Sequence, residues 1–488
     1  MHVHIVAVAG TGMGALAGLL SQLGHQVSGS DVAFYPPMGA ALERWGIECM
    51  TGFDPVHLDS KPDLVVVGNM CRRDNSEAVA AFERGLRVTH IAGALRELAL
   101  SGTAPLVVAG THGKTTTTAL AAFLLDALGR NPGFLIGGIP VNFGMSARPA
   151  SNGTAHLPIA SRIQRRTPFV IEGDEYDTAY FEKTAKFLHY GAEVAIITSI
   201  EHDHIDIYPD FDKYRNAFAQ FIAGIPESGL IVARAADAQV VELVLQHARA
   251  EVAWYSLQAE PTQGQSPHWL AAPLPATPDG TSFDVYAGGV YAGRFMTQLT
   301  GEYNVGNVLA ALAAAAQGYG ASLGELRVAL PRFQGVMRRQ QLLGRPGGVA
   351  VIDDFAHHPT AVLETLRGLR ERYRAGHFYA VFEARSATAC RKIHQEAYAR
   401  AFDAADSVLL APLGRANIPA DEQLDRQRLV ADLKARGKDA QEYPNVQSIV
   451  ENLVARAISG DVIAVLSNGD FGGIHHLLLE QLEQLKRK

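Results

Sequence analysis

Short apolar runs alternate with helix-like segments along most of the chain. The clearest runs span residues 3–9, 64–67, 106–109, 194–200 and 462–466, and each is followed by a glycine, a polar or an acidic residue. Apolar strands that alternate with helices predict parallel, doubly wound sheets. Ligands bind such sheets beyond the carboxyl ends of the strands, so the residues that follow these runs are the candidate functional residues.

Loop-like stretches divide this pattern into three units. A chain of 488 residues fits about three domains of ~150 residues each. We predict doubly wound domains at residues 1–103 and 333–488, with a central domain at residues 104–332 between them. The expected fold class is therefore α/β, with three domains and mostly parallel sheets.

A β-hairpin and two surface insertions are predicted inside the central domain. Residues 282–299 alternate around Gly288-Gly289 and predict a β-hairpin. Residues 146–168 and 258–281 are rich in turn-forming residues and predict surface insertions.

Composition narrows the class of protein. The net charge of −7 argues against a basic surface for nucleic acid. Cys49, Cys71 and Cys390 lie far apart with no C-x-x-C spacing, which fits a reducing compartment. No apolar run reaches the ~18 residues that a membrane helix needs, and the first residues lack signal-peptide features. We therefore expect a cytoplasmic protein with no nucleic-acid or membrane partner.

The most informative motif is Gly-Thr-His-Gly-Lys-Thr at residues 110–115, between an apolar run and the helix-like residues 119–128. In a phosphate-binding loop, backbone N–H groups face an anion at a helix N-terminus, a lysine reaches the outer phosphates, and a threonine hydroxyl ligates Mg²⁺. The alternative is a glycine-rich turn with a chance lysine. The residues assigned to ATP from this motif are Gly110, Thr111, His112, Gly113, Lys114, Thr115 and Thr116.

Metal-binding groups follow two further apolar runs. Glu172 follows one of them and His204 the other. A carboxylate beside a phosphate loop suits Mg²⁺, which prefers oxygen ligands. Histidine is a less usual ligand, and a packed or surface histidine is the alternative for His204. We predict that Thr115, Glu172 and His204 bind the metal. Asp174, Glu175 and Asp177 bind metal or substrate, or are solvated.

A second glycine turn lies near the N-terminus. Gly10-x-Gly12-x-x-Ala15, with Asp31 about 20 residues further on, fits the dinucleotide-binding fingerprint. Alone it would indicate a nicotinamide-dependent oxidoreductase. Any nucleotide diphosphate can use the same turn and helix dipole, and a turn needed only for packing is a further alternative.

Polar residues near the second domain junction complete the candidates. Asn304 and Asn307 share one helix face and could hydrogen-bond an adenine edge, although N-capping by Asn304 is an alternative. Arg339 could stabilise a transferring phosphoryl group, and Asp353 could hold a ribose.

Together these motifs resemble the Mur ligase family, which builds the peptide of bacterial peptidoglycan. The markers are Gly110-Thr-His-Gly-Lys114-Thr-Thr, Glu172, His204-Ile-Asp206, Gly301-x-x-Asn304-x-x-Asn307, Arg339 and Asp353, spread over essentially the whole chain. The resemblance implies an N-terminal Rossmann-like domain for a UDP-sugar, a central ATPase domain, and a C-terminal Rossmann-like domain that closes over the site.

Residues 10–14 and 353–360 resemble the branch of this family that acts on UDP-N-acetylmuramate itself. Phe218 falls where several other members carry a carbamylated, metal-binding lysine, which this branch lacks. One member of the branch adds L-alanine. Another, a recycling enzyme, adds the tripeptide L-alanyl-γ-D-glutamyl-meso-diaminopimelate.

Residues 35–38, 172–181 and 467–473 resemble the recycling member. The chain departs from it at Ala384 and Ala387, where proline and asparagine are often found, and at Asp470, where a second glycine is common. These departures could alter contacts with the peptide.

The resemblance implies an ATP-dependent ligase that joins this tripeptide to UDP-N-acetylmuramate through an acyl phosphate. The implied catalytic residues are Lys114, Glu172, His204, Arg339 and His357. The implied substrate contacts are Gly10, Thr11, Gly12, Met13, Gly14, Asp31, Asn69, His90, Arg385 and Ser467. The runner-up is a UDP-N-acetylmuramate–L-alanine ligase, and other classes are the nicotinamide-dependent oxidoreductase and a regulatory ATPase that binds UDP-sugars without ligation.

Overall fold

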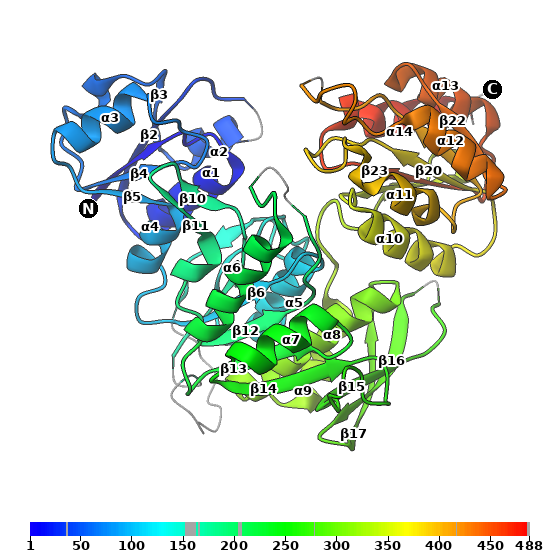
Figure 1. Cartoon of the computed structure of the whole chain (residues 1–488), viewed down its shortest axis with the longest axis horizontal. Coiled ribbons are helices and arrows are strands. Elements are labelled where there is room, and N and C mark those ends of the chain that lie inside the picture. The colour runs from blue at the N-terminus through cyan, green and yellow to red at the C-terminus, as the bar shows by residue number, and fades with distance from the viewer. Residues whose placement is uncertain are drawn as a thin grey trace.

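Three α/β units surround a common centre (Figure 1). The computed structural model describes residues 1–35, 38–151, 163, 166–203, 207–277, 279–415 and 417–485. Three sheets of five, ten and six strands form the units, and most of their strand pairs are parallel. The expected α/β class with three domains and mostly parallel sheets is confirmed.

The N-terminal unit holds a parallel sheet in the order β3-β2-β1-β4-β5. Its strands are β1 (His2–Val6), β2 (Gln26–Asp31), β3 (Glu48–Thr51), β4 (Leu64–Val67) and β5 (Val88–His90), and its helices are α1 (Thr11–Gln22), α2 (Met38–Arg44), α3 (Ser76–Glu83) and α4 (Ile91–Leu98). The chain moves to one side of β1 and then to the other. This switch point creates a crevice beyond the end of β1, where the turn at Gly10 lies.

The central unit holds ten strands in the order β17-β16-β15-β14-β13-β12-β6-β9-β7-β8. They are β6 (Ala104–Ala109), β7 (Gly133–Leu135), β8 (Ala147–Arg148), β9 (Pro168–Glu172), β12 (Val194–Ile197), β13 (Leu230–Arg234), β14 (Glu251–Ser256), β15 (Trp269–Pro273), β16 (Thr281–Ala287) and β17 (Val290–Thr297). The helices are α5 (Lys114–Ala127), α6 (Phe211–Gly224), α7 (Ala238–His247), α8 (Glu302–Ala313) and α9 (Leu323–Ala329), and β10 (Asp177–Ala179) pairs separately with β11 (Glu182–Ala185). Strand β6 is completely buried, so the loop that follows it starts from a fixed point.

The expected hairpin is confirmed as β16 and β17, joined at Gly288 and Gly289. These glycines have φ values of 58° and 80°, which residues with a side chain rarely adopt. The expected surface insertion at residues 258–281 is wrong in part because it contains β15. Trp269 of this strand is buried, and its indole donates to Gln317, so tertiary contacts override the local composition. Most of the other expected insertion, residues 146–168, lies outside the described residues.

The C-terminal unit holds six strands in the order β18-β19-β23-β20-β21-β22. They are β18 (Gln341–Gly344), β19 (Ala350–Asp354), β20 (Phe378–Phe382), β21 (Ser407–Leu410), β22 (Asp439–Glu442) and β23 (Val462–Leu466), and the helices are α10 (Pro359–Arg372), α11 (Gln395–Ala401), α12 (Arg426–Ala435), α13 (Val446–Arg456) and α14 (Ile474–Leu485). Separate apolar cores cover the two faces of this sheet. Helix α10 lies on the side of the unit that faces the central unit (Figure 1).

Among the described helices, none combines the length and the apolar character that crossing a bilayer requires. The three cysteines are free thiols.

Candidate active site

A cavity of about 1390 Å³ lies where the three units meet, and we call it the main cavity. Its wall includes the turn after β1, the loop after β6 and the start of α10. The residues singled out from the sequence that line it are Gly10, Thr11, Gly12, Met13, Asp31, Asn69, Thr111, His112, Gly113, Lys114, Thr115, Thr116, Glu172, Asp174, Glu175, Asn304, Asn307, Arg339 and His357. Residues far apart in the chain therefore share one site.

The expected phosphate loop, residues 110–115, joins β6 directly to α5. Gly113 caps α5 with a φ of 79°, a left-handed conformation. A Cβ atom at Gly113 would also lie only 2.4 Å from Oδ1 of Asn307. Glycine is thus required here both by the backbone and by the approach of α8. The loop leads into the N-terminus of α5, whose first backbone N–H groups lie where anion binding needs them.

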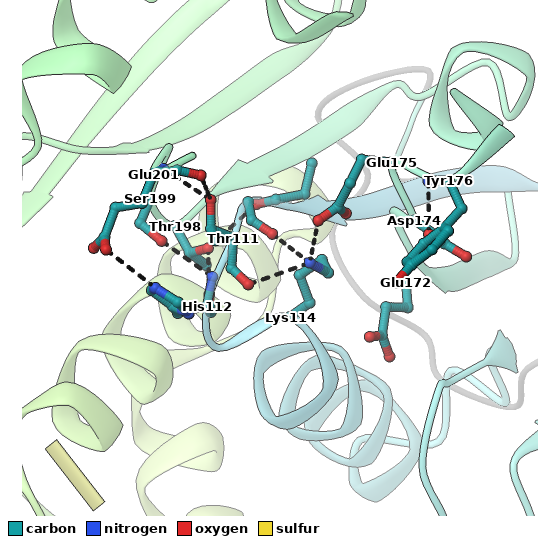
Figure 2. A network of polar contacts seen from close by, with 12 residues as sticks. Thr111, His112, Lys114, Glu172, Asp174, Glu175, Tyr176, Thr198, Ser199 and Glu201 are labelled. Atoms are coloured by element: carbon teal, nitrogen blue, oxygen red, sulfur yellow. Dashed lines mark hydrogen bonds and ion pairs between the residues drawn. The ribbon is translucent and has the colours of Figure 1, made fainter. Parts of the chain in front are cut away.

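Lys114 extends from the first turn of α5 across this loop (Figure 2). Its Nζ donates to the carbonyl of Gly110 at 2.6 Å and to Oε1 of Glu175 at 3.0 Å. Burial disfavours the charged amine, but the carboxylates of Glu175 and Glu172 outweigh it and raise the pKa of Lys114. A positive charge is therefore held at the place where an outer phosphate is expected.

Glu175 is a functional candidate that the sequence left undecided. Its side chain is 1% exposed, and the hydroxyl of Tyr214 lies 3.3 Å from its Oε1. The hydroxyl of Tyr208 donates to its backbone carbonyl at 2.7 Å. Burial and these contacts fix Glu175 as the partner of Lys114. The sequence signal was its place just after the strand beside the phosphate loop.

Thr115, Glu172 and Arg339 form a second polar group in the main cavity. The Thr115 hydroxyl donates to Oε1 of Glu172 at 2.9 Å and accepts from Nη2 of Arg339 at 3.2 Å. Burial raises the pKa of Glu172, while Lys114 and the N–H of Gly137 act in the opposite direction. The two oxygen side chains suit a hard divalent cation. His204, the third expected ligand, lies outside the described residues.

The segment after β12 holds the phosphate loop from the other side (Figure 2). Thr111 N–H donates to the carbonyl of Ser199 at 2.8 Å, and His112 N–H donates to its Oγ at 3.2 Å. The hydroxyl of Thr198 donates to the carbonyl of His112 at 2.6 Å, and Glu201 N–H donates to Oγ1 of Thr111 at 2.8 Å. These four hydrogen bonds tie the phosphate loop to the segment after β12. Thr198 and Ser199 could not be predicted from the sequence, because hydroxyl side chains after a strand are common.

The two asparagines of α8 lie together at the wall of the main cavity. The N-cap of α8 is Gly301, so Asn304 is not the cap. Asn304 donates to the carbonyl of Thr300 at 2.9 Å, and Asn307 donates to Oδ1 of Asn304 at 3.2 Å. Further polar residues that line the cavity and were not expected from the sequence are Arg234, Ser256, Gln258 and Tyr303.

In the N-terminal unit, Asp31 holds the glycine turn in place. Its Oδ2 accepts from Ala9 N–H at 2.8 Å, and its Oδ1 accepts from Val32 N–H at 2.7 Å. Gly10 then caps α1 and leaves the helix N-terminus facing the main cavity. Gly14, one turn into the helix, does not line the cavity but faces the side chain of Met38.

His90, Gly110 and Asp353 are further expected site residues that do not line the main cavity. His90 caps α4 by accepting from Gly93 N–H at 3.2 Å, and its Nε2 lies 3.0 Å from Oε2 of Glu182. Asp353 lies 3.3 Å from Arg338, whereas its neighbour Asp354 lines the cavity. Successive residues of a strand point to opposite faces, which separates the two aspartates of β19. The substrate role of His90 and the ATP-binding role of Asp353 stay predictions.

A smaller cavity of about 390 Å³ adjoins the main one, and we call it the second cavity. It is lined by Tyr176, Arg385, Ser386, Ala387, Thr388, Gly414, Arg415 and Asn468. Tyr176, Ser386 and Asn468 line both cavities, so the two communicate. Arg415 was not expected, since a single arginine after a strand carries no sequence signal.

Arg385, the expected peptide contact, is an exposed residue at the second cavity. Its Nη1 pairs with Oδ1 of Asp470 at 2.9 Å, and the two side chains are 42% and 77% exposed. Ser467 donates to Glu383 at 2.5 Å and lines neither cavity. An exposed ion pair of this kind contributes only ~0.2–1 kcal/mol, so an incoming carboxylate could replace Asp470.

Phe218 is completely buried in α6, with its ring 5.3 Å from Phe187 and 5.2 Å from Tyr214. An apolar side chain in an aromatic cluster cannot ligate a metal. The position therefore offers no counterpart of a carbamylated lysine.

Comparison with known families and structures agrees with this geometry. Three consecutive family models match: Mur ligase family catalytic domain at residues 2–103, Mur ligase middle domain at 108–315, and Mur ligase glutamate ligase domain at 338–469.

Individual relatives match over their full length. The UDP-N-acetylmuramate–L-alanyl-gamma-D-glutamyl-meso-2,6-diaminoheptandioate ligase of Escherichia coli (strain K12) is 38% identical over 99% of this chain and 98% of its own. The UDP-N-acetylmuramate–L-alanine ligase of Roseiflexus sp. (strain RS-1) is 33% identical over 99% of this chain and 100% of its own. The crystal structure of a murein peptide ligase from Psychrobacter arcticus is 34% identical, has a TM-score of 0.69 and covers 99% of both chains. The chain belongs to the Mur ligase family.

Proposed function

We propose that this protein is an ATP-dependent ligase that joins L-alanyl-γ-D-glutamyl-meso-diaminopimelate to UDP-N-acetylmuramate. The observation that carries the proposal is the main cavity, where a phosphate loop, a diphosphate-type glycine turn and the C-terminal unit face one space. Relatives at 38% and 36% identity over 99% of the chain carry the name of this ligase. The expected place of action is peptidoglycan recycling.

The phosphate loop binds ATP in this proposal. Lys114 and the N–H groups at the start of α5 hold the outer phosphates, and Asn304 and Asn307 face the nucleotide from α8. The Oγ1 atom of Thr115 and the Oε1 atom of Glu172 lie 2.9 Å apart, and these two residues would hold Mg²⁺ together with His204. The bound ion would neutralise charge on the phosphates.

The reaction has two steps. The lactyl carboxylate of UDP-N-acetylmuramate attacks the γ-phosphorus of ATP, ADP leaves, and an acyl phosphate forms. The alanyl amine of the tripeptide then attacks the acyl carbon, inorganic phosphate leaves, and the nitrogen loses its proton. Lys114 and Arg339 stabilise the charge that develops during phosphoryl transfer. His357 lines the main cavity and is the candidate for accepting the amine proton.

In this proposal, the N-terminal unit holds the UDP part of the sugar substrate, and the second cavity holds the carboxylates of the tripeptide. The glycine turn at residues 10–13 takes the UDP diphosphate at the N-terminus of α1. Arg385 and Arg415 of the second cavity take carboxylates of the tripeptide. Free L-alanine is too short to engage both cavities, which favours the tripeptide over the L-alanine-adding alternative.

One incubation tests this proposal. The protein, UDP-N-acetylmuramate and ATP are mixed with either the tripeptide or L-alanine, and products are identified by mass spectrometry while ADP is measured. We expect repeated turnover of ATP to ADP only when sugar and peptide are both present, with the tripeptide adduct as product. ADP formation in the absence of both the tripeptide and L-alanine, with no ligated product, would instead indicate a regulatory ATPase.

A further inference from the structure

One carboxylate joins the phosphate loop to the C-terminal unit. Glu201 follows β12 in the central unit, and its Oε2 accepts a hydrogen bond from the hydroxyl of Thr360 at 2.8 Å. The same Oε2 lies 3.3 Å from Nε2 of His112. Thr360 belongs to the first turn of α10, and His112 belongs to the phosphate loop. Thr360, Glu201 and His112 therefore link the two units through side chains.

The surroundings of Glu201 favour its charged form. Burial alone would raise the pKa of Glu201, but His112 and the Thr360 hydroxyl outweigh burial and lower it to about 2. The carboxylate also faces the N-terminus of α10, a 14-residue helix whose dipole favours a negative charge there. The contact between the two units is thus a charge-assisted hydrogen bond.

His112, Glu201 and His358 lie close enough together to hold a metal ion. The hydrogen bonding of His358 argues against this use. Its Nδ1 accepts from Thr360 N–H at 3.3 Å, so the neutral ring carries its proton on Nε2. Burial and the neighbouring His112 lower the pKa of His358 to about 3. Its ring packs 4.7 Å from that of His112, as a neighbour rather than a ligand.

Glu201 also holds the loop through its backbone (Figure 2). Its N–H donates to Oγ1 of Thr111 at 2.8 Å, and its carbonyl accepts from the same hydroxyl at 3.0 Å. A movement of α10 that pulls on the Glu201 side chain therefore acts on Thr111 and His112. Both lie next to the glycines that shape the phosphate loop.

We propose that Glu201 and Thr360 are positioning residues whose hydrogen bond couples docking of the C-terminal unit to alignment of the phosphate loop for phosphoryl transfer. This inference rests on the proposed ligase function. Neither residue has to touch phosphate, since each acts through the loop. The bond forms only when α10 lies against the central unit, so the loop is fully supported only in the docked state.

The test compares two variants at one position. Thr360→Val keeps the shape of the side chain but removes the donor, whereas Thr360→Ser keeps the donor. We expect Thr360→Val to lower kcat about 10-fold at saturating ATP, with the KM for ATP changed less than about 2-fold, because a charge-assisted bond is lost while the phosphate contacts remain. Thr360→Ser should stay within about 2-fold of the wild type in kcat.

Two further measurements separate positioning from docking alone. Arg372 lies at the other end of α10 and donates to the carbonyl of Gln298 in the central unit at 3.4 Å. Arg372→Ala removes a contact between the same units without touching the loop, so its kcat should match that of the wild type. Adding Glu201→Gln to Thr360→Val should lower kcat by less than the product of the two single effects, because both act through one bond.

The outcomes distinguish the two proposals. A wild-type protein that ligates, together with a folded Thr360→Val variant that turns over equally fast, would overturn the positioning role and leave the ligase function intact. An Arg372→Ala variant as slow as Thr360→Val would overturn it too, since docking alone would explain the loss. A wild type that forms no ligated product would refute the ligase function and this inference with it. The melting temperatures of all variants are measured alongside.

Discussion

In the phosphate loop, Lys114 is 14% exposed and its partner Glu175 is 1% exposed, whereas at the second cavity Arg385 is 42% and Asp470 77% exposed. The loop charges are fixed by backbone geometry and by buried partners before ATP arrives. The charges of the second cavity lie in water and can exchange partners. This contrast implies that phosphoryl transfer depends on preorganised groups, while the choice of amine depends on weaker contacts that the peptide itself completes.

The largest effect is expected for Lys114→Ala. Loss of a preorganised charge should lower the rate of ligation at least about 10²–10³-fold. The variant should also melt at a lower temperature, because the buried carboxylate of Glu175 loses its partner. The double variant with Glu175→Gln should recover the melting temperature but not the activity. Recovery of activity in the double variant would show that Lys114 serves only to balance Glu175.

The second-largest loss of activity is expected for Glu172→Gln. The amide keeps the shape and one acceptor for Thr115 but removes the charge that suits Mg²⁺. We expect a loss of about 10²-fold in kcat at ordinary Mg²⁺ concentration, partly restored by more Mg²⁺. Titration of turnover with Mg²⁺ measures this. An unchanged metal requirement would remove Glu172 from the metal site.

Arg385→Glu tests the role of the exposed charges at the second cavity. It should lower kcat/KM for the tripeptide about 10-fold, because a carboxylate contact becomes a repulsion. Any residual use of L-alanine should change less, since alanine does not reach the second cavity. Arg415→Ala is the companion variant on the same cavity wall. Equal losses with both amines would indicate a structural role for Arg385.

Asp470→Asn should give the smallest effect, and in the opposite direction. Asp470 competes with the peptide for Arg385, and an exposed pair is worth only ~0.2–1 kcal/mol. Its removal should lower the KM for the tripeptide about 2–4-fold with kcat unchanged. Steady-state kinetics at varied tripeptide concentration measure this. A higher KM would mean that Asp470 contacts the peptide directly, for example at its ammonium group.

The sequence predicted the features that depend on local chemistry. The phosphate loop needs glycine at Gly113 for its left-handed backbone, and the hairpin needs Gly288-Gly289, so both were visible as motifs. The parallel units followed from apolar runs alternating with helices. The residues that make up each of these signals lie close together in the chain, so each feature could be predicted from the sequence alone.

Other features depend on which face or which neighbour the fold supplies. Asp353 and Asp354 are adjacent in sequence, and only the strand geometry decides that Asp354 lines the main cavity. Arg415 has no distinguishing local pattern, because its role arises from a cavity between loops. Glu175 has a signal in its place after a strand, but only the fold shows that it is buried against Lys114. The Glu201–Thr360 contact joins residues 159 positions apart and could not be read from either segment alone.

The ratio of kcat/KM for the tripeptide to that for L-alanine, measured with UDP-N-acetylmuramate and ATP saturating, tests the account most directly. If the second cavity completes recognition of the amine, the ratio should exceed about 100, because binding energy far from the reacting nitrogen stabilises the transition state. A ratio of one or less would contradict the account. It would assign the protein to L-alanine addition and leave the second cavity without a role in choosing the amine.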